Sequence, residues 1–385
     1  AQAFETIGDA VALLGRVLEI DPGLLDVRHD LAELYSRQSA TVPLAIEQHL
    51  AILAVDPLRL DSLLPLFSLF ERTRADHDRA FALGGVLEYL GVLDSADLLG
   101  MQAYRGHSMK DARRGLSPAE RESLLLYPEE GGALAKWLAL VAERLADLFP
   151  VNLKQRGVLK AHRLPGSGSD SVYNYCMRLA DSFGARKFSI YKLPVADRPL
   201  EVASTDPPSL LLLGSALEGW SLPQRRFHLA RAISSFANGL HVIAALGEQT
   251  TAALVAASVL LEEEDLELEG LDERLVERCA ETLHDHLPDR LKRSLAQLGR
   301  LVLGGPASLP EQVRRATFSM NRAGLLFAGD VHVVLGELVG PASPALPLED
   351  RLARLQQSPA ALDLISWLLT EQYARLRLDL SLAVE

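Results

Sequence analysis

The sequence predicts a mainly α-helical protein, with an N-terminal array of helical hairpins and a larger helical domain that holds a small β-sheet. Three observations carry this prediction. A repeat of 35 residues runs through residues 1–105. Apolar residues recur at helical spacing through most of the remaining chain. Short runs typical of strands occur between residues 187 and 214, so the predicted sheet is small.

Composition and charge exclude several classes of protein. The chain has 385 residues, 48% hydrophobic and 23% charged, which is typical of a folded protein of two or three domains. Its net charge of −12 disfavours nucleic acid and anionic lipid as partners. The longest nearly uncharged apolar stretch, residues 250–261, is shorter than the roughly 20 residues of a membrane span. We expect no nucleic-acid partner and no membrane span.

The start of the sequence and the cysteines bear on the compartment. No basic segment followed by an apolar one opens the chain, which favours a cytoplasmic protein, although the missing initiator Met leaves a removed leader open. Cys176 and Cys279 are too few for a disulfide framework or a four-thiolate zinc site. We predict that both are buried core residues.

The N-terminal repeat emerges when the chain is aligned with itself. Residues 18–22 (LEIDP) recur as residues 53–57 (LAVDP), an offset of 35 that also places Leu31 over Leu66. Each unit is predicted to form two amphipathic helices. An Asp-Pro pair ends the second helix, because proline has no amide hydrogen to donate.

These units resemble the tetratricopeptide repeat. Its consensus has a Leu, a small residue and a Tyr in the first helix, an Ala early in the second and a Pro at the end. Leu31, Ala32, Tyr35, Ala45 and Pro57 occupy those places, whereas the consensus Trp is missing. The resemblance implies a binding array over this stretch. An ordinary array of helical hairpins without a binding role is the alternative.

The same resemblance implies a binding face, because tetratricopeptide arrays bind partners on the inner face of their first helices. Transferring that register from Leu31 and Leu66 gives ten positions: Asp26, His29, Glu33, Ser36, Arg37, Asp61, Leu64, Ser68, Glu71 and Arg72. Both sets begin with Asp and end with Arg, and such side chains can bond a peptide backbone or clamp carboxylates. We therefore expect another protein or a peptide segment as partner. A solvated helix face is the alternative, and the oligomeric state stays open.

Residues 106–170 are predicted to form a helical linker region. Ser117 and the Glu three residues later have the spacing of a capping box. A helix is predicted at about residues 132–148, from apolar residues at helical spacing. Asp170 or Ser171 is placed to cap the helix that follows.

The next segment, residues 171–345, is predicted to be the larger domain, with C-terminal helices over residues 346–385 packing on it. Residues 187–192 alternate as a half-buried strand does, and residues 201–204 are a candidate to pair with them. Residues 209–214 have the composition of a buried strand. Helices are predicted to begin near residues 222, 250, 272, 310, 347 and 359.

This order of elements resembles the peptidase-M48 type of zinc metalloprotease domain. The stretch LLLGSAL at residues 211–217 is similar to the family's strand that leads into the zinc-binding helix, and NRAGLLFAGD at residues 321–330 is similar to a later family motif. In that family a His-Glu-x-x-His helix supplies two zinc ligands and a general base. Residues 231–235 stand at that motif, and they read RAISS.

The resemblance therefore implies a zinc site that has lost its ligands. The downstream Glu ligand falls on a Thr, and the Asp that orients a ligand falls on an Asn. The degenerate former zinc site comprises Arg231, Ala232, Ser235, Thr317 and Asn321. We expect no catalytic residues, no metal and no cofactor. We also expect Gly324 to permit close packing between its helix and the helix of Arg231.

Other side chains do not assemble a catalytic set by spacing. His228 and His241 are thirteen residues apart on what is predicted to be one helix, too far for one site. His284 and His286 point to different sides of a helix. The acidic run at residues 262–269 lacks the spacing of a calcium loop and is predicted to be solvated.

We therefore expect a non-catalytic protein–protein interaction scaffold or adaptor, built from repeats and a pseudo-peptidase domain. The alternatives are a hydrolase whose zinc ligands are unrecognised and a structural subunit of a larger complex.

Overall fold

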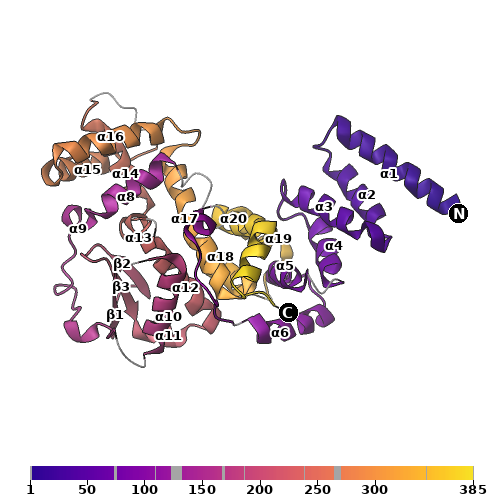
Figure 1. Cartoon of the computed structure of the whole chain (residues 1–385), viewed down its shortest axis with the longest axis horizontal. Coiled ribbons are helices and arrows are strands. Elements are labelled where there is room, and N and C mark those ends of the chain that lie inside the picture. The colour runs from indigo at the N-terminus through magenta and orange to yellow at the C-terminus, as the bar shows by residue number, and fades with distance from the viewer. Residues whose placement is uncertain are drawn as a thin grey trace. The chain divides into compact units, whose positions relative to one another are not determined.

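The computed structural model of the chain describes residues 2–72, 76–108, 110–122, 132–166, 170–185, 187–237, 239–263, 270–343 and 345–384. For residues 2–6 and 106–108 it describes the backbone alone. The predicted mainly α-helical fold with a small β-sheet is confirmed (Figure 1). No helix in these ranges is both long and apolar enough to cross a membrane.

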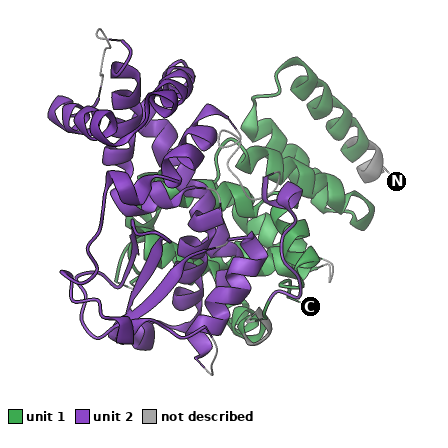
Figure 2. Cartoon of the chain, turned by 60° about the vertical axis from the view of Figure 1, so that its left-hand side comes forward, with its two compact units in different colours: residues 1–111, 329–385 green, residues 112–328 purple. Residues whose placement is uncertain are grey.

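The chain divides into two compact units (Figure 2). Unit 1 combines residues 1–111 with residues 329–385, and unit 2 is residues 112–328. We expected boundaries at residues 105, 170 and 345, with residues 346–385 packed on the second domain. The structure instead groups these C-terminal residues with the N-terminal array.

Unit 1 consists of helices. Its N-terminal part contains α1 (Gln2–Ile20), α2 (Leu25–Ser36), α3 (Val42–Leu53), α4 (Leu60–Glu71), α5 (His77–Leu90) and α6 (Ser95–Ser108). Its C-terminal part contains α18 (Val331–Val339), α19 (Leu348–Gln356), α20 (Pro359–Leu368) and α21 (Glu371–Asp379).

The sequence period of unit 1 is a period of helices. α4 begins and ends 35 residues after α2, at residues 60 and 71 against 25 and 36. α5 likewise begins 35 residues after α3, at residue 77 against 42. Leu31 and Leu66 are both buried, as are Ala45 and Ala80. Equivalent residues of successive 35-residue repeats are therefore buried alike.

A buried ion pair explains why the C-terminal helices belong to unit 1. The carboxylate of Asp78, on α5, accepts two hydrogen bonds from the guanidinium of Arg377, on α21, at 2.7 and 2.8 Å. The backbone N–H of Val384 donates to the same carboxylate, at 2.9 Å. α18, α19 and α20 also pack on α5. α5 is thus the core helix of unit 1, and the C-terminal residues cover it.

Unit 2 contains helices around a small sheet. The helices are α7 (Pro118–Glu120), α8 (Ala133–Ala142), α9 (Leu145–Leu148), α10 (Ser171–Phe183), α11 (Gly214–Gly219), α12 (Leu222–Ala237), α13 (His241–Leu246), α14 (Glu248–Leu260), α15 (Glu273–His286), α16 (Asp289–Leu303) and α17 (Leu309–Ala328). The strands are β1 (Ser189–Leu193), β2 (Leu200–Ala203) and β3 (Ser209–Leu213).

The strands pair in the order β1-β3-β2. β3 runs parallel to β1 and antiparallel to β2. The expected pairing of residues 201–204 with the first strand is therefore wrong, because the buried β3 lies between them. β2 is an edge strand of the sheet, and α11 begins directly where β3 ends.

Most of the predicted local signals are confirmed. Ser117 and Glu120 form the capping box. The Asp170 side chain caps α10 by accepting from the N–H of Tyr173. The helix predicted at residues 132–148 is interrupted after Ala142 and continues as α9. Of the acidic run, residues 264–269 lie outside the described part of the chain.

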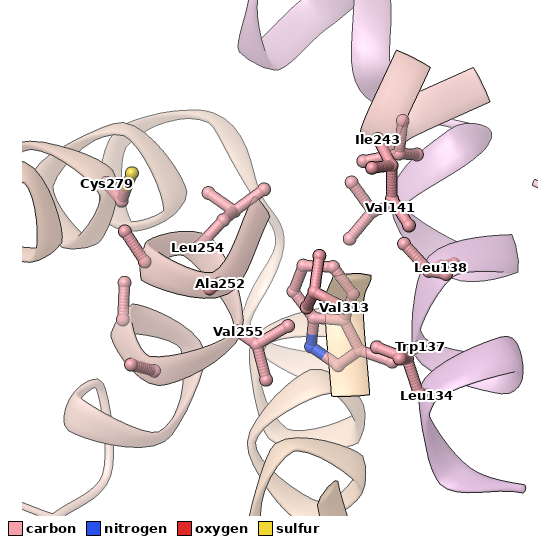
Figure 3. Packing of buried hydrophobic residues seen from close by; sticks show 14 of the residues in the cluster. Leu134, Trp137, Leu138, Val141, Ile243, Ala252, Leu254, Val255, Cys279 and Val313 are labelled. Atoms are coloured by element: carbon pink, nitrogen blue, oxygen red, sulfur yellow. The ribbon is translucent and has the colours of Figure 1, made fainter. Parts of the chain in front are cut away.

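The main core of unit 2 lies around Trp137 of α8. Its indole N–H donates to the Ser258 hydroxyl of α14 at 3.1 Å, so this large ring is buried without an unsatisfied donor. Figure 3 shows the ring beside Val255 and Val313, among side chains of several helices. Cys279 belongs to the same cluster. Both cysteines are buried, as predicted.

Candidate functional site

The candidate site lies in unit 2, where α12 and α17 pack side by side. Gly324 of α17 makes this possible: a Cβ on it would lie 2.5 Å from Cδ2 and 3.1 Å from the carbonyl oxygen of Phe227, on α12. The close packing expected at this glycine is confirmed. The two helices that carry the predicted degenerate zinc site are therefore neighbours.

A cavity of about 520 Å³ opens beside these helices. That volume is typical of a small-molecule site. β2, α12, α13, α17 and the start of α14 supply its walls. The lining residues are Arg198, Leu200, Glu201, Val202, His228, Arg231, Ala232, Ile243, Ala244, Leu246, Gly247, Glu248, Gln249, Thr250, Thr317 and Met320.

Three of the five residues of the predicted degenerate site line this cavity: Arg231, Ala232 and Thr317. Ser235 and Asn321 are buried and lie outside its lining. The Ser235 hydroxyl donates to the Ala232 carbonyl at 2.6 Å. The Thr317 hydroxyl donates to the carbonyl of Arg314 at 2.7 Å. Both hydroxyls are thus engaged within their own helices.

Arg231 is the charged group of α12 in this cavity. Its Nε is buried, and no acceptor in the described ranges bonds it. Burial lowers the pKa of Arg231, and the nearby charge of Glu248 opposes that shift. A guanidinium nevertheless stays protonated in proteins. The cavity therefore contains a fixed positive charge.

The α14 N-terminus contributes a second positive feature. Gly247 precedes the helix with φ of +83°, a left-handed conformation that suits glycine. Because Gly247 has no side chain, the first backbone amides of α14 have no side-chain cap. Glu248, Gln249 and Thr250 line the cavity. The helix start, with its partial positive charge, thus lies at the cavity wall.

Three further polar residues of the lining are engaged elsewhere or lie in solvent. Glu201 pairs with Arg156. The His228 ring stacks on Trp220 with centroids 4.4 Å apart. Arg198 is exposed. In the described ranges, no three His, Cys, Asp or Glu side chains gather in a way that could hold a metal ion.

The other histidines stand apart from the cavity wall. His241 begins α13, so the expectation that it shares one helix with His228 is wrong. Burial lowers the pKa of His241. His284 and His286 are exposed in the last turn of α15, as expected of a solvated helix surface.

The face predicted on the unit 1 array is a second candidate. Asp26 of α2 and Asp61 of α4 occupy equivalent positions, and both bind Arg59, at 2.6 and 2.8 Å. Hydrogen bonding from Arg59 to Asp61 is the largest cause of the lowered pKa of Asp61. Asp26 and Asp61, the first residues of the two predicted sets, thus bind the same guanidinium.

The middle of this face holds a histidine cluster. His29 approaches Glu33 at 3.6 Å between Nε2 and Oε1. Its ring lies 5.9 Å from that of the buried His49, between centroids. Burial lowers the pKa of His49 to about 4, with the charge of His29 as the second cause. His29 is thus bound to its neighbours.

The remaining predicted positions include two serines, Leu64 and Glu71. The Ser36 and Ser68 hydroxyls donate to the carbonyls of Glu33 and Leu64, within their own helices. The Leu64 side chain is exposed. Burial raises the pKa of Glu71, with Asp97 as the second cause.

The last positions of the two sets, Arg37 and Arg72, are exposed. In the ranges that the structure covers, no carboxylate pairs with either arginine.

Sequence reasoning missed Arg59 and the helix start at Gly247. Arg59 lies directly before α4, outside the helix positions that the tetratricopeptide resemblance implies. Its equivalent in the previous repeat, residue 24, is Leu. No repeat signal therefore marked it. A glycine directly before an uncapped helix was the available signal at residue 247.

Comparison of the chain with protein-family models, with curated proteins and with solved structures finds no match.

Proposed function

We propose that this chain is a non-catalytic protein–protein interaction scaffold whose unit 1 array binds an extended segment of another protein. One observation carries the proposal: equivalent side chains of successive helical pairs lie next to one another on one face. Asp26 and Asp61, 35 residues apart in sequence, bind the same Arg59. A repeated face of this kind offers a partner the same groups at regular spacing.

The exposed arginines at the end of each set supply the binding chemistry. Arg37 follows α2, and Arg72 follows α4 at the equivalent position. A guanidinium can bind a carboxylate or a backbone carbonyl through two parallel hydrogen bonds. We expect the partner segment to carry acidic side chains or a free carboxyl terminus that these arginines bind.

The unit 2 cavity supports a binding role rather than turnover. Its helices carry Arg231, Ala232 and Thr317 where the resembled peptidases carry zinc ligands and a base. The Thr317 hydroxyl donates to its own helix. This chemistry is that of recognition, since an arginine and a helix start bind anions.

The double variant Arg37→Ala/Arg72→Ala tests the array. We expect affinity purification from the native cell, read by mass spectrometry, to recover with the wild type a protein that this variant loses. The matched control is Arg274→Ala/Arg278→Ala, which removes two exposed arginines from α15. Titration with the purified partner should show at least tenfold weaker binding, about 1.4 kcal/mol. The melting temperature should stay nearly unchanged, because exposed substitutions shift stability by about 0.5 kcal/mol or less.

Wild-type affinity in the arginine double variant would move the binding surface off this face. Recovery of the partner at fixed stoichiometry in a permanent complex would favour the alternative of a structural subunit. About one zinc per chain, found by elemental analysis and removable by a chelator with loss of a peptidase activity, would establish the hydrolase alternative.

A further inference from the structure

Arg231 lies on the wall of the unit 2 cavity without a bound counterion. No described acceptor reaches its buried Nε, and no described carboxylate forms an ion pair with it. Glu248 influences it only through the longer-range charge interaction, and the Glu248 side chain is exposed to solvent. The positive charge is therefore available to a group that enters the cavity.

An unpaired guanidinium at a partly buried position is unfavourable for folding. Burial of a charge without a partner destabilises a protein, whereas an apolar residue of similar volume at the same place does not. Ala232, the next residue, shows that this helix accepts a small apolar side chain at the same wall. The arginine thus lowers stability, and an anionic ligand would offset that cost.

The uncapped start of α14 points to the same class of ligand independently. Its first amides have no side-chain cap, and Glu248, Gln249 and Thr250 stand at the cavity wall. Amide hydrogens at a helix start bind oxyanions. Arg231 and this helix start belong to different elements but line one cavity, so one anion can use both.

The other walls define the rest of the ligand. Apolar side chains of Ile243, Leu246 and Met320 line the cavity, which favours a ligand with an apolar body. Glu201 pairs with Arg156, but Glu248 also lines the cavity. This carboxylate repels a dianionic phosphate ester more strongly than a singly charged carboxylate.

We propose that the unit 2 cavity binds the carboxylate group of a ligand with an apolar body, through the Arg231 guanidinium and the first amides of α14. The carboxylate belongs either to a free medium-chain acid or to the carboxyl terminus of an apolar peptide. This site is separate from the unit 1 array, so its existence does not depend on the proposed scaffold function.

Titration calorimetry with the full chain tests the proposal. The probes are octanoate, N-acetyl-leucyl-leucine, the amide of that dipeptide, and octyl phosphate. We expect octanoate or the dipeptide carboxylate to bind. If the dipeptide binds, its amide should bind at least tenfold more weakly. Stronger binding of octanoate assigns a free acid, and stronger binding of the dipeptide assigns a carboxyl terminus.

Two variants identify the groups involved. Arg231→Met should weaken binding of the carboxylate probe at least tenfold, whereas Arg274→Met, which removes an exposed arginine from α15, should leave it unchanged. Glu248→Gln should strengthen binding severalfold, because it removes a negative charge that competes for Arg231. Arg231→Met should also raise the melting temperature without ligand, which shows that it folds.

Three results would overturn the proposal. The first is the absence of carboxylate binding to the wild type. The second is equal binding of carboxylate to the wild type and to Arg231→Met. The third is stronger binding of octyl phosphate than of either carboxylate, which would assign the cavity to phosphate esters instead.

Discussion

Gly324 and Phe227 approach one another so closely that a Cβ on the glycine would lie 2.5 Å from the phenylalanine ring. The same Cβ would lie 3.1 Å from the backbone oxygen of Phe227, which cannot move without shifting α12. This contact therefore sets the distance between the two helices that form the cavity wall.

Replacement of Gly324 by Leu should overpack this contact. We expect the free energy of unfolding to fall by about 1–3 kcal/mol, because side chains added to a packed interface displace its neighbours. Urea denaturation measures the change. Gly219→Ala is the control, since a Cβ at Gly219 would meet no atom within 4 Å. Unchanged stability of Gly324→Leu would mean that the two helices do not pack at this residue.

Loss of the Asp78 carboxylate should destabilise unit 1 strongly. Asp78→Asn leaves the buried guanidinium of Arg377 without its counterion. We expect a loss of about 3–5 kcal/mol in the free energy of unfolding, as for other broken buried ion pairs. Asp26→Asn is the matched control, because that carboxylate also binds an arginine but its side chain is 92% exposed. The control should lose no more than about 1 kcal/mol, and equal losses in both variants would contradict the prediction.

His49 should make the protein less stable in mild acid. Its folded-state pKa is lowered from 6.5 to about 4. Between these values the unfolded chain binds the proton and the folded chain does not, so the unfolding free energy falls as the pH drops from 6.5 toward 4. The full effect is about 3 kcal/mol.

His49→Leu should remove this part of the pH dependence, which denaturation at a series of pH values measures. His284→Gln changes an exposed histidine and should retain the wild-type slope. The same slope in His49→Leu and in the wild type would show that another group is responsible.

Arg59→Ala should raise the pKa of Asp61, because the hydrogen bond from Arg59 is the largest cause of its lowered value. Carboxyl chemical shifts followed by NMR during a pH titration measure this change. Above the ordinary pKa of Asp61 the ion pair stabilises the fold, and the effect is lost as the pH falls through the folded-state pKa. The stability change should stay below about 1 kcal/mol, since Asp61 is exposed.

Arg28→Ala is the control for this titration. Arg28 bonds Gln48 and the carbonyl of Pro22 rather than Asp61. An unchanged Asp61 pKa in Arg59→Ala, or an equal rise in Arg28→Ala, would show that Arg59 does not hold the carboxylate.

The repeat was readable from the sequence because its signal is local and recurs. Leu31 and Leu66 are buried in equivalent helices, and an Asp-Pro pair follows both α1 and α3. Helix starts were also readable where a side chain caps the helix, as Asp170 caps α10.

Long-range pairing was not readable from the sequence. Asp78 and Arg377 are 299 residues apart, and neither lies in a pattern that identifies the other. The strand order was missed for a similar reason, since β2 pairs with β3 through register and burial rather than composition. The ion pair joins the C-terminal helices to unit 1. The strand order leaves β2 at an edge of the sheet.

The candidate site was readable in part. The sequence predicted that Arg231 of α12 and Thr317 of α17 belong to one site, and both residues line the same cavity. The contribution of Gly247 and Glu248 was missed because it comes from the start of another helix. A helix start acts through its backbone amides, which every non-proline residue possesses.

Unit 2 is inserted between the two segments that make up unit 1. A ribosome synthesises the chain from its N-terminus, so unit 2 is complete once Ala328 has emerged, while unit 1 still lacks its last four helices. Domains fold as units during synthesis. Asp78 therefore lacks its partner until Arg377 has been synthesised, and until then α5 also lacks the C-terminal helices that pack on it. A chain truncated after Ala328 would contain all residues of unit 2 but none of the C-terminal helices that pack on α5.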